Sequence, residues 1–142
     1  MEIHLGASSF ISENFSFNKN SVYKISSKKK KNFIKVNYNN LYFLNKILLK
    51  NKIDYIIFFL GKNLKGKNLK KSYYLNYSLP LKILNFLINN NNHKVYKFIF
   101  FGTFLEDENK TSNENLDYKK HKIKFRKKVI ALSKKNCLIL CG

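Results

Sequence analysis

Short apolar segments alternate with amphipathic ones along most of the chain. Segments rich in β-branched and aromatic side chains predict strands at 2–5, 21–26, 33–36, 54–60, 95–101 and 137–140. Apolar residues spaced three or four positions apart predict helices around 41–48, 81–88 and 118–132, and a shorter, more polar helix at about 10–17. Lysine-rich, asparagine-rich or acidic stretches predict loops at 62–71, 89–92 and 106–117.

Strands that alternate with helices indicate parallel β-α-β units. Because such crossovers are right-handed, we expect a doubly wound α/β fold of three layers, with about six strands and helices on both faces of the sheet. A chain of 142 residues is long enough for one domain of this kind, and we assign 1–142 to it.

Composition narrows the class of protein. Hydrophobic residues make up 44% of the chain, which is enough for a core and argues against disorder. No stretch is long and apolar enough to cross a membrane, and the first residues do not resemble a secretory signal. The two cysteines, Cys137 and Cys141, form no disulfide framework and have no histidine nearby for a metal site. We therefore expect a reduced, cytoplasmic protein without a bound metal.

The net charge of +20 is the outlying feature, with 28 basic and 8 acidic residues. Only Arg126 among the basic residues is an arginine, and the chain is also rich in Asn, Ile, Phe and Tyr, a pattern typical of A/T-rich codons. Lysines at this density would nevertheless neutralise phosphates, so a lysine-rich RNA-binding protein of ribosomal type is the alternative hypothesis. The shortage of arginine and the spread of lysines through every segment count against it.

Two local patterns suggest chemistry. Gly6 follows the first predicted strand, where a tight turn lets a pyrophosphate approach backbone N–H groups at a helix N-terminus. Tyr118 and Lys122 are four residues apart, so both side chains lie on one face of the last helix. A nearby ammonium favours phenolate, which suits a tyrosine for acid/base catalysis. Thr103, after the preceding strand, is placed to hydrogen-bond a substrate oxygen.

Together these pieces resemble the extended short-chain dehydrogenase/reductase family, the NAD(P)-dependent epimerase/dehydratase group that acts on nucleotide sugars. The matching landmarks are the opening strand and its Gly-x-x-Gly-x-x-Gly turn (3–12), the fourth strand (52–61), the Asn that opens the next helix (Asn76), the fifth strand with its terminal Ser/Thr (98–103) and the Tyr-x-x-x-Lys pair (118–122).

The resemblance implies a Rossmann-like fold, a nicotinamide dinucleotide and a nucleotide sugar or related hydroxyl or carbonyl substrate. It implies that Tyr118 is the acid/base, that Lys122 binds the nicotinamide ribose and tunes Tyr118, and that Thr103 orients the substrate. The cofactor-binding residues that it implies are Gly6, Ser8, Ser9, Phe10, Ile11, Ser12, Lys28, Leu60, Gly61, Asn76 and Lys122. Because Lys28 occupies the position of the adenosine ribose, where NAD-preferring members have an acid, we expect NADP rather than NAD.

The chain departs from the family in three respects. Ser9 and Ser12 replace two of the three glycines, and the first helix is short and polar. The sequence given also ends where family members continue into the part that builds the nucleotide-sugar pocket. We therefore expect a domain that lacks the C-terminal substrate-binding portion: a truncated or decaying gene product, half of a split protein, or a minimal form completed by a partner. A Rossmann-like protein without catalytic activity also remains open. Family members often dimerise through the helix with the Tyr-Lys pair, which places a homodimer contact at 118–134.

Overall fold

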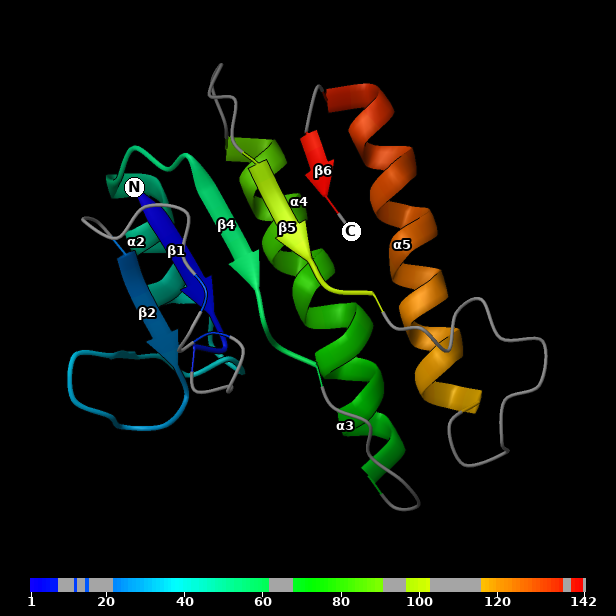
Figure 1. Cartoon of the computed structure of the whole chain (residues 1–142), viewed down its shortest axis with the longest axis horizontal. Coiled ribbons are helices and arrows are strands. Elements are labelled where there is room, and N and C mark those ends of the chain that lie inside the picture. Colours follow the sequence, from blue (N-terminus) through cyan, green and yellow to red (C-terminus); the bar gives the residue numbers. More distant parts are fainter. Residues whose placement is uncertain are drawn as a thin grey trace.

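In the computed structural model the chain forms an α/β, Rossmann-like domain built around one parallel sheet (Figure 1). The structure describes residues 1–7, 12, 15, 22–61, 68–90, 97–102, 116–136 and 139–141. The strands are β1 (Glu2–Leu5), β2 (Val22–Ser26), β3 (Ile34–Lys35), β4 (Tyr55–Phe58), β5 (Lys97–Phe100) and β6 (Ile139–Cys141).

The strand order is β3-β2-β1-β4-β5-β6, and all neighbours pair in parallel. Strands β2 and β3 are added on one side of β1, and β4, β5 and β6 are then added on its other side. The order therefore reverses between β1 and β4, which pair with each other from Glu2 opposite Tyr55 to Leu5 opposite Phe58. In such sheets ligands bind beyond the carboxyl ends of the strands at this reversal.

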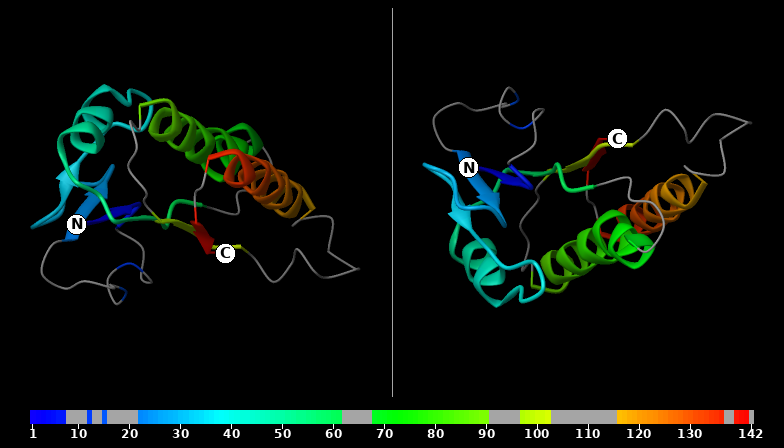
Figure 2. Two further views of the ribbon diagram at one scale, coloured as in Figure 1. Left: turned by 90° about the horizontal axis from the view of Figure 1, so that it is seen from above. Right: turned by 90° about the horizontal axis from the view of Figure 1, so that it is seen from below.

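The helices are α2 (Tyr42–Lys50), α3 (Leu69–Tyr73), the π-helix η2 (Tyr74–Ser78), α4 (Leu79–Asn90) and α5 (Leu116–Asn136). Segments α3, η2 and α4 follow one another without a break. Figure 2 shows that α2, α4 and α5 all lie on one face of the sheet. On the other face, Ser12 and Phe15 are the only residues between 8 and 21 that the structure describes, so the helix expected at about 10–17 lies almost entirely outside the described residues.

The hydrophobic core lies between the sheet and these helices. Alternate strand residues face it, and the fully or almost fully buried ones are Ile3, Leu5, Ile25, Ile56, Phe58, Phe98 and Phe100. The helices contribute Leu44, Leu48, Leu79, Ile83, Leu84, Leu87, Phe125 and Val129. The spacing that predicted the helices in the sequence thus corresponds to the residues that they bury.

Two predicted loops end earlier than expected. The loop expected at 62–71 ends earlier, because α3 begins at Leu69. The loop expected at 106–117 also ends earlier, since α5 begins at Leu116 and Asp117 lies in its first turn. Leucine and lysine are good helix formers, but a lysine-rich stretch is equally typical of an exposed loop, so composition alone did not reveal these starts. The strand expected at 137–140 corresponds to β6, Ile139–Cys141, and residues 137 and 138 lie outside the described residues.

Candidate functional site

The turn after β1 is packed closely against the end of β4. Gly6 has a φ of 80°, and a Cβ atom there would lie 2.7 Å from Leu60 Cγ and 2.8 Å from the Leu60 backbone nitrogen. The Gly6 N–H donates to the Ile25 carbonyl at 3.0 Å and to the Tyr38 hydroxyl at 3.0 Å. Both the backbone conformation and the lack of space require glycine, as the sequence predicted.

Tyr38 supports this turn and was not identified from the sequence. Its side chain is buried, its hydroxyl donates to the Ile25 carbonyl at 3.2 Å, and burial raises its pKa to about 12. Its own carbonyl accepts from the Tyr74 hydroxyl at 2.5 Å. Tyr38 thus remains a neutral phenol that joins the first turn to β2 and η2. The only available sign in the sequence was a tyrosine shortly after the third predicted strand.

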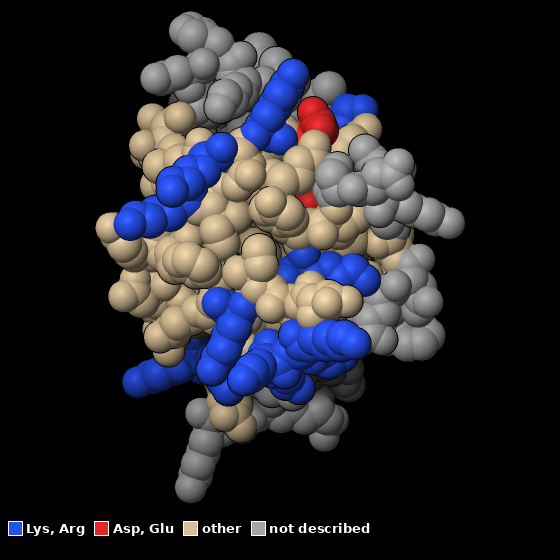
Figure 3. Space-filling view, turned by 90° about the vertical axis from the view of Figure 1, so that its left-hand side faces the viewer, with Lys and Arg blue, Asp and Glu red and all other residues tan. Residues whose placement is uncertain are grey.

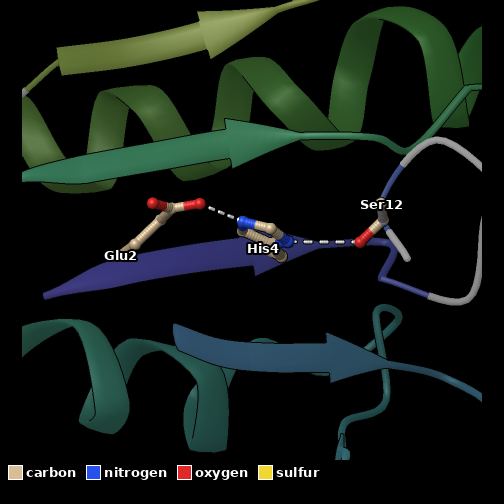
Figure 4. Close-up of polar contacts among 3 residues, drawn as sticks. All are labelled: Glu2, His4 and Ser12. Carbon is tan, nitrogen blue, oxygen red and sulfur yellow. Dashed lines mark hydrogen bonds and ion pairs between the residues drawn. The ribbon is translucent and has the colours of Figure 1, made fainter. Parts of the chain in front are cut away.

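Ser12 is buried, and its side chain points toward β1 (Figure 4). Its Oγ lies 3.2 Å from His4 Nδ1, and the Nε2 atom of the same ring contacts the Glu2 carboxylate. Any contact of Ser12 with a pyrophosphate would therefore come from its backbone. Ser8, Ser9, Phe10 and Ile11, predicted to bind the cofactor with it, lie outside the described residues.

Three predicted residues meet at the carboxyl end of β4. A Cβ atom on Gly61 would lie 3.0 Å from Asn76 Oδ1 and 3.5 Å from Lys122 Nζ. Asn76 is itself held in place because its Nδ2 donates to the Ser72 carbonyl at 2.8 Å. An amide, an ammonium and a glycine backbone from three separate elements thus converge on one point of the sheet edge.

The position of Asn76 in its helix differs from the prediction. Asn76 does not open a helix: it lies inside the continuous helical run, in the π-helical segment η2. A π-turn adds one residue to a helix and changes the direction of the side chains there, and such turns occur often at functional sites. The predicted residue is therefore at the site, but an irregular turn places it there rather than a helix start.

Lys122 is a buried cation at this site. It is 9% exposed, and its ammonium donates to the Phe101 carbonyl at 2.7 Å, just beyond β5. Its Nζ lies 5.9 Å from the centre of the Tyr118 ring, so the Tyr-Lys pair of α5 faces the same edge as Asn76. Thr103, the third predicted catalytic residue, lies outside the described residues.

Lys28 is separate from this group. It is exposed directly after β2, and its backbone N–H donates to Ser26 Oγ at 3.1 Å. Because β2 is parallel to β1 and β4, Lys28 lies beyond the same carboxyl edge of the sheet as the turn after β1.

Two kinds of feature are absent from the described part of the chain. No helix there is long and apolar enough to cross a membrane. Within the same residues, no group of three or more His, Cys, Asp or Glu side chains is arranged to hold a metal ion.

Comparison with known proteins gives a match in structure but none in sequence: no family model and no curated protein matches the chain. A short-chain dehydrogenase/reductase from Saccharomyces cerevisiae superposes with a TM-score of 0.78 at 14% identity, over 97% of this chain and 66% of that one. The chain has the fold of these dehydrogenases. A short-chain dehydrogenase family protein from Francisella tularensis gives a TM-score of 0.71 at 22% identity, over 94% of this chain and 62% of that one.

An epimerase structure has the same fold. UDP-glucose 4-epimerase from Bifidobacterium longum, solved with NAD+ and UDP, gives a TM-score of 0.71 at 17% identity, over 95% of this chain and 49% of that one. This chain therefore spans about half to two thirds of the length of these three dehydrogenase and epimerase structures.

Proposed function

We propose that the protein is a short-chain dehydrogenase/reductase domain that binds a nicotinamide dinucleotide at the carboxyl edge of its sheet. The observation that carries this proposal is the convergence of Gly61, Asn76 and Lys122, with Tyr118 beside Lys122. Residues from three separate segments of the chain meet at the carboxyl end of β4, beside the strand-order reversal where this fold binds its ligands.

The residues present fit such a cofactor. Gly6 and Gly61 leave backbone without a side chain at two points of the edge, and a Cβ at either would meet neighbouring atoms within 3.0 Å. Lys122 supplies a buried cation that suits ribose hydroxyls, and Gly6 begins the turn that would bind the pyrophosphate. Lys28 would face a 2′-phosphate, which favours NADP. When bound, the nicotinamide supplies a hydride acceptor or donor.

Residues of the protein would transfer the proton to or from the substrate oxygen. The Tyr118 phenol would exchange a proton with the hydroxyl or carbonyl oxygen of the substrate. The Lys122 ammonium, near the Tyr118 ring, would stabilise the phenolate and hold the nicotinamide ribose. Thr103 would orient the substrate oxygen. By the resemblance of the sequence, the substrate would be a nucleotide sugar or a related hydroxyl or carbonyl compound.

Lys122→Met tests the proposal, and Lys124→Met is its matched control. Both remove one charge from α5, but Lys124 is exposed and contacts Tyr73 and Tyr77 instead of the site. Losing a charged hydrogen-bond donor to the ribose should weaken NADPH binding by at least about tenfold in Lys122→Met. The control should stay within about twofold of the wild type. Equal effects in calorimetric titrations would show that charge alone, not a site, attracts the dinucleotide.

The charge distribution supports a second candidate function, the binding of a single-stranded RNA. Residues 22–61 contain nine lysines and one carboxylate, and Figure 3 shows lysine or arginine side chains gathered on the side of the molecule that β2 and α2 form. Tyr42 and Phe43 are 66% and 52% exposed on α2, where aromatic rings are available for base stacking. Salt dependence separates this function from a dinucleotide site.

A further inference from the structure

A chain of three polar side chains lies buried on the face of β1 opposite the hydrophobic core. Glu2 and His4 alternate with Ile3 and Leu5, so they point to the side of the sheet that Ser12 and Phe15 cover. Glu2, His4 and Ser12 are each 0% exposed. The Glu2 carboxylate contacts His4 Nε2, and His4 Nδ1 lies 3.2 Å from Ser12 Oγ (Figure 4).

The direction of these hydrogen bonds follows from their chemistry. An ionised carboxylate only accepts, so with Glu2 ionised His4 Nε2 carries a proton and donates it to Glu2. A neutral ring then has an unprotonated Nδ1, which accepts from the Ser12 hydroxyl; a protonated ring donates from Nδ1 to Ser12 Oγ instead. In both states His4 connects Glu2 with Ser12.

The surroundings of His4 make the three residues depend on one another. The His4 ring lies 5.0 Å from the Phe59 ring, and Phe59 packs against Phe101 and Phe15. Phenylalanine rings carry no conventional hydrogen-bond donor or acceptor, so these three rings supply no alternative partner to the His4 ring. A buried hydroxyl or ring nitrogen that loses its hydrogen bond destabilises the fold, because its bond to water was already lost on burial and nothing replaces it.

The arrangement is unsuited to nucleophilic catalysis. A serine, a histidine and a carboxylate in a hydrogen-bonded chain resemble the order of a hydrolase triad. Here, however, all three side chains are fully buried, so no substrate reaches Ser12 Oγ. The three hydrogen-bonded side chains are therefore suited to holding the backbone at Ser12 in place.

We propose that Glu2 and His4 are positioning residues that fix the far end of the turn after β1. The near end is fixed at Gly6 by the Ile25 carbonyl and the Tyr38 hydroxyl. The far end is fixed at Ser12, whose hydroxyl is held by His4. This inference rests on the proposed function, because the turn between them is where the pyrophosphate would bind.

This arrangement also accounts for a serine at the last glycine position of the turn. Glycine there lets the first helix pack directly on an apolar strand. A serine at this position brings a buried hydroxyl, and His4 is a hydrogen-bond partner for it. Ser12, His4 and Glu2 thus form one interdependent set that replaces the close contact of a glycine.

Ser12→Ala tests the proposal without introducing a buried charge, and Ser133→Ala, on the outer part of α5, is its control. Without the hydrogen bond at Ser12, the turn must lose conformational freedom when NADPH binds, and this entropic cost weakens binding. NADPH affinity should therefore fall about tenfold in Ser12→Ala and stay within about twofold of the wild type in the control. Glu2→Gln keeps an acceptor for His4 Nε2 and should also stay within about twofold. Unchanged affinity in Ser12→Ala would overturn the proposal.

The ¹⁵N chemical shifts of the free protein give a readout that does not depend on a cofactor. We expect His4 Nε2 to be protonated, and Ser12→Ala to shift the His4 Nδ1 signal while the signals of His121 stay unchanged. An unprotonated Nε2 in the wild type, or an Nδ1 signal that is the same in both proteins, would overturn the positioning role. If the wild type failed to bind NADPH, the proposed function would fail, while these shifts would still decide whether His4 holds Ser12.

Discussion

At the scale of single residues, the fold depends on a close approach between the turn after β1 and the end of β4. Gly6→Ala should lose more stability than a positive φ alone explains, because its Cβ would lie 2.7–2.9 Å from three atoms of Leu60. Asn32→Ala is the matched control, since Asn32 also has a positive φ, 63°, but is exposed.

Chemical denaturation measures both variants. The left-handed backbone costs an alanine about 1–2 kcal/mol relative to glycine, and asparagine already bears part of that cost, so Asn32→Ala should lose no more than this amount. Gly6→Ala should exceed that loss and should also abolish measurable dinucleotide binding. Equal losses of unfolding free energy in the two variants would contradict the close packing of Gly6 on Leu60.

The sequence predicted some of these residues and missed others for a physical reason. The places of Gly6, Gly61 and Lys122 in the fold could be predicted, because the glycines follow predicted strands and Lys122 lies on one face of a predicted helix. Tyr38 and His4 were missed because their partners, Gly6 and Ser12, become neighbours only after folding. The alternation of Glu2 and His4 with apolar residues indicated a polar strand face, but not that this face is buried.

At the scale of elements, the packing of α3 against α5 buries part of His121. Its Nδ1 is buried without a hydrogen-bond partner among the described residues, and its ring lies edge-on to Tyr73 at 5.1 Å. Burial lowers the pKa of His121, an effect that Asp117 partly opposes. The folded protein therefore disfavours the protonated ring.

This shift predicts how stability depends on pH. Below a pH of about 6.5 the unfolded chain takes up a proton at His121 that the folded protein binds only at lower pH. The free energy of unfolding should therefore fall as the pH drops through that range. His121→Phe keeps the ring contact with Tyr73 and should lose less stability over the same range. Denaturation curves with the same pH dependence in both proteins would contradict the buried state of His121.

The element order was predictable from periodicity, but two features of the helices were not. The strands and the helices α2, α4 and α5 follow from apolar spacing, because the residues that match the pattern are those that the core buries. The start at Leu69 and the π-helical segment with Asn76 carry no such signal. A π-turn is maintained by tertiary contacts, here with α5, which local sequence does not encode.

At the scale of the whole molecule, strand order and net charge point to different ligands. The reversal between β1 and β4 places Gly6, Gly61 and Lys122 at one edge, which suits a dinucleotide. The charge of +20 would attract any polyanion. The fold class was predictable because alternating strands and helices allow few topologies. Composition gave the net charge but could not decide whether the lysines bind a polyanion, since lysine enrichment also follows from codon usage.

A titration of the wild-type protein with NADPH, NADH and a single-stranded RNA, each at low and at moderate salt, tests the central claim most directly. The proposed site predicts saturable one-to-one binding of NADPH that survives moderate salt, with NADH weaker because it lacks the phosphate that Lys28 would face. Binding of both dinucleotides that is weak, lost at moderate salt and exceeded by the RNA would contradict a dinucleotide site and assign the charge to nucleic acid.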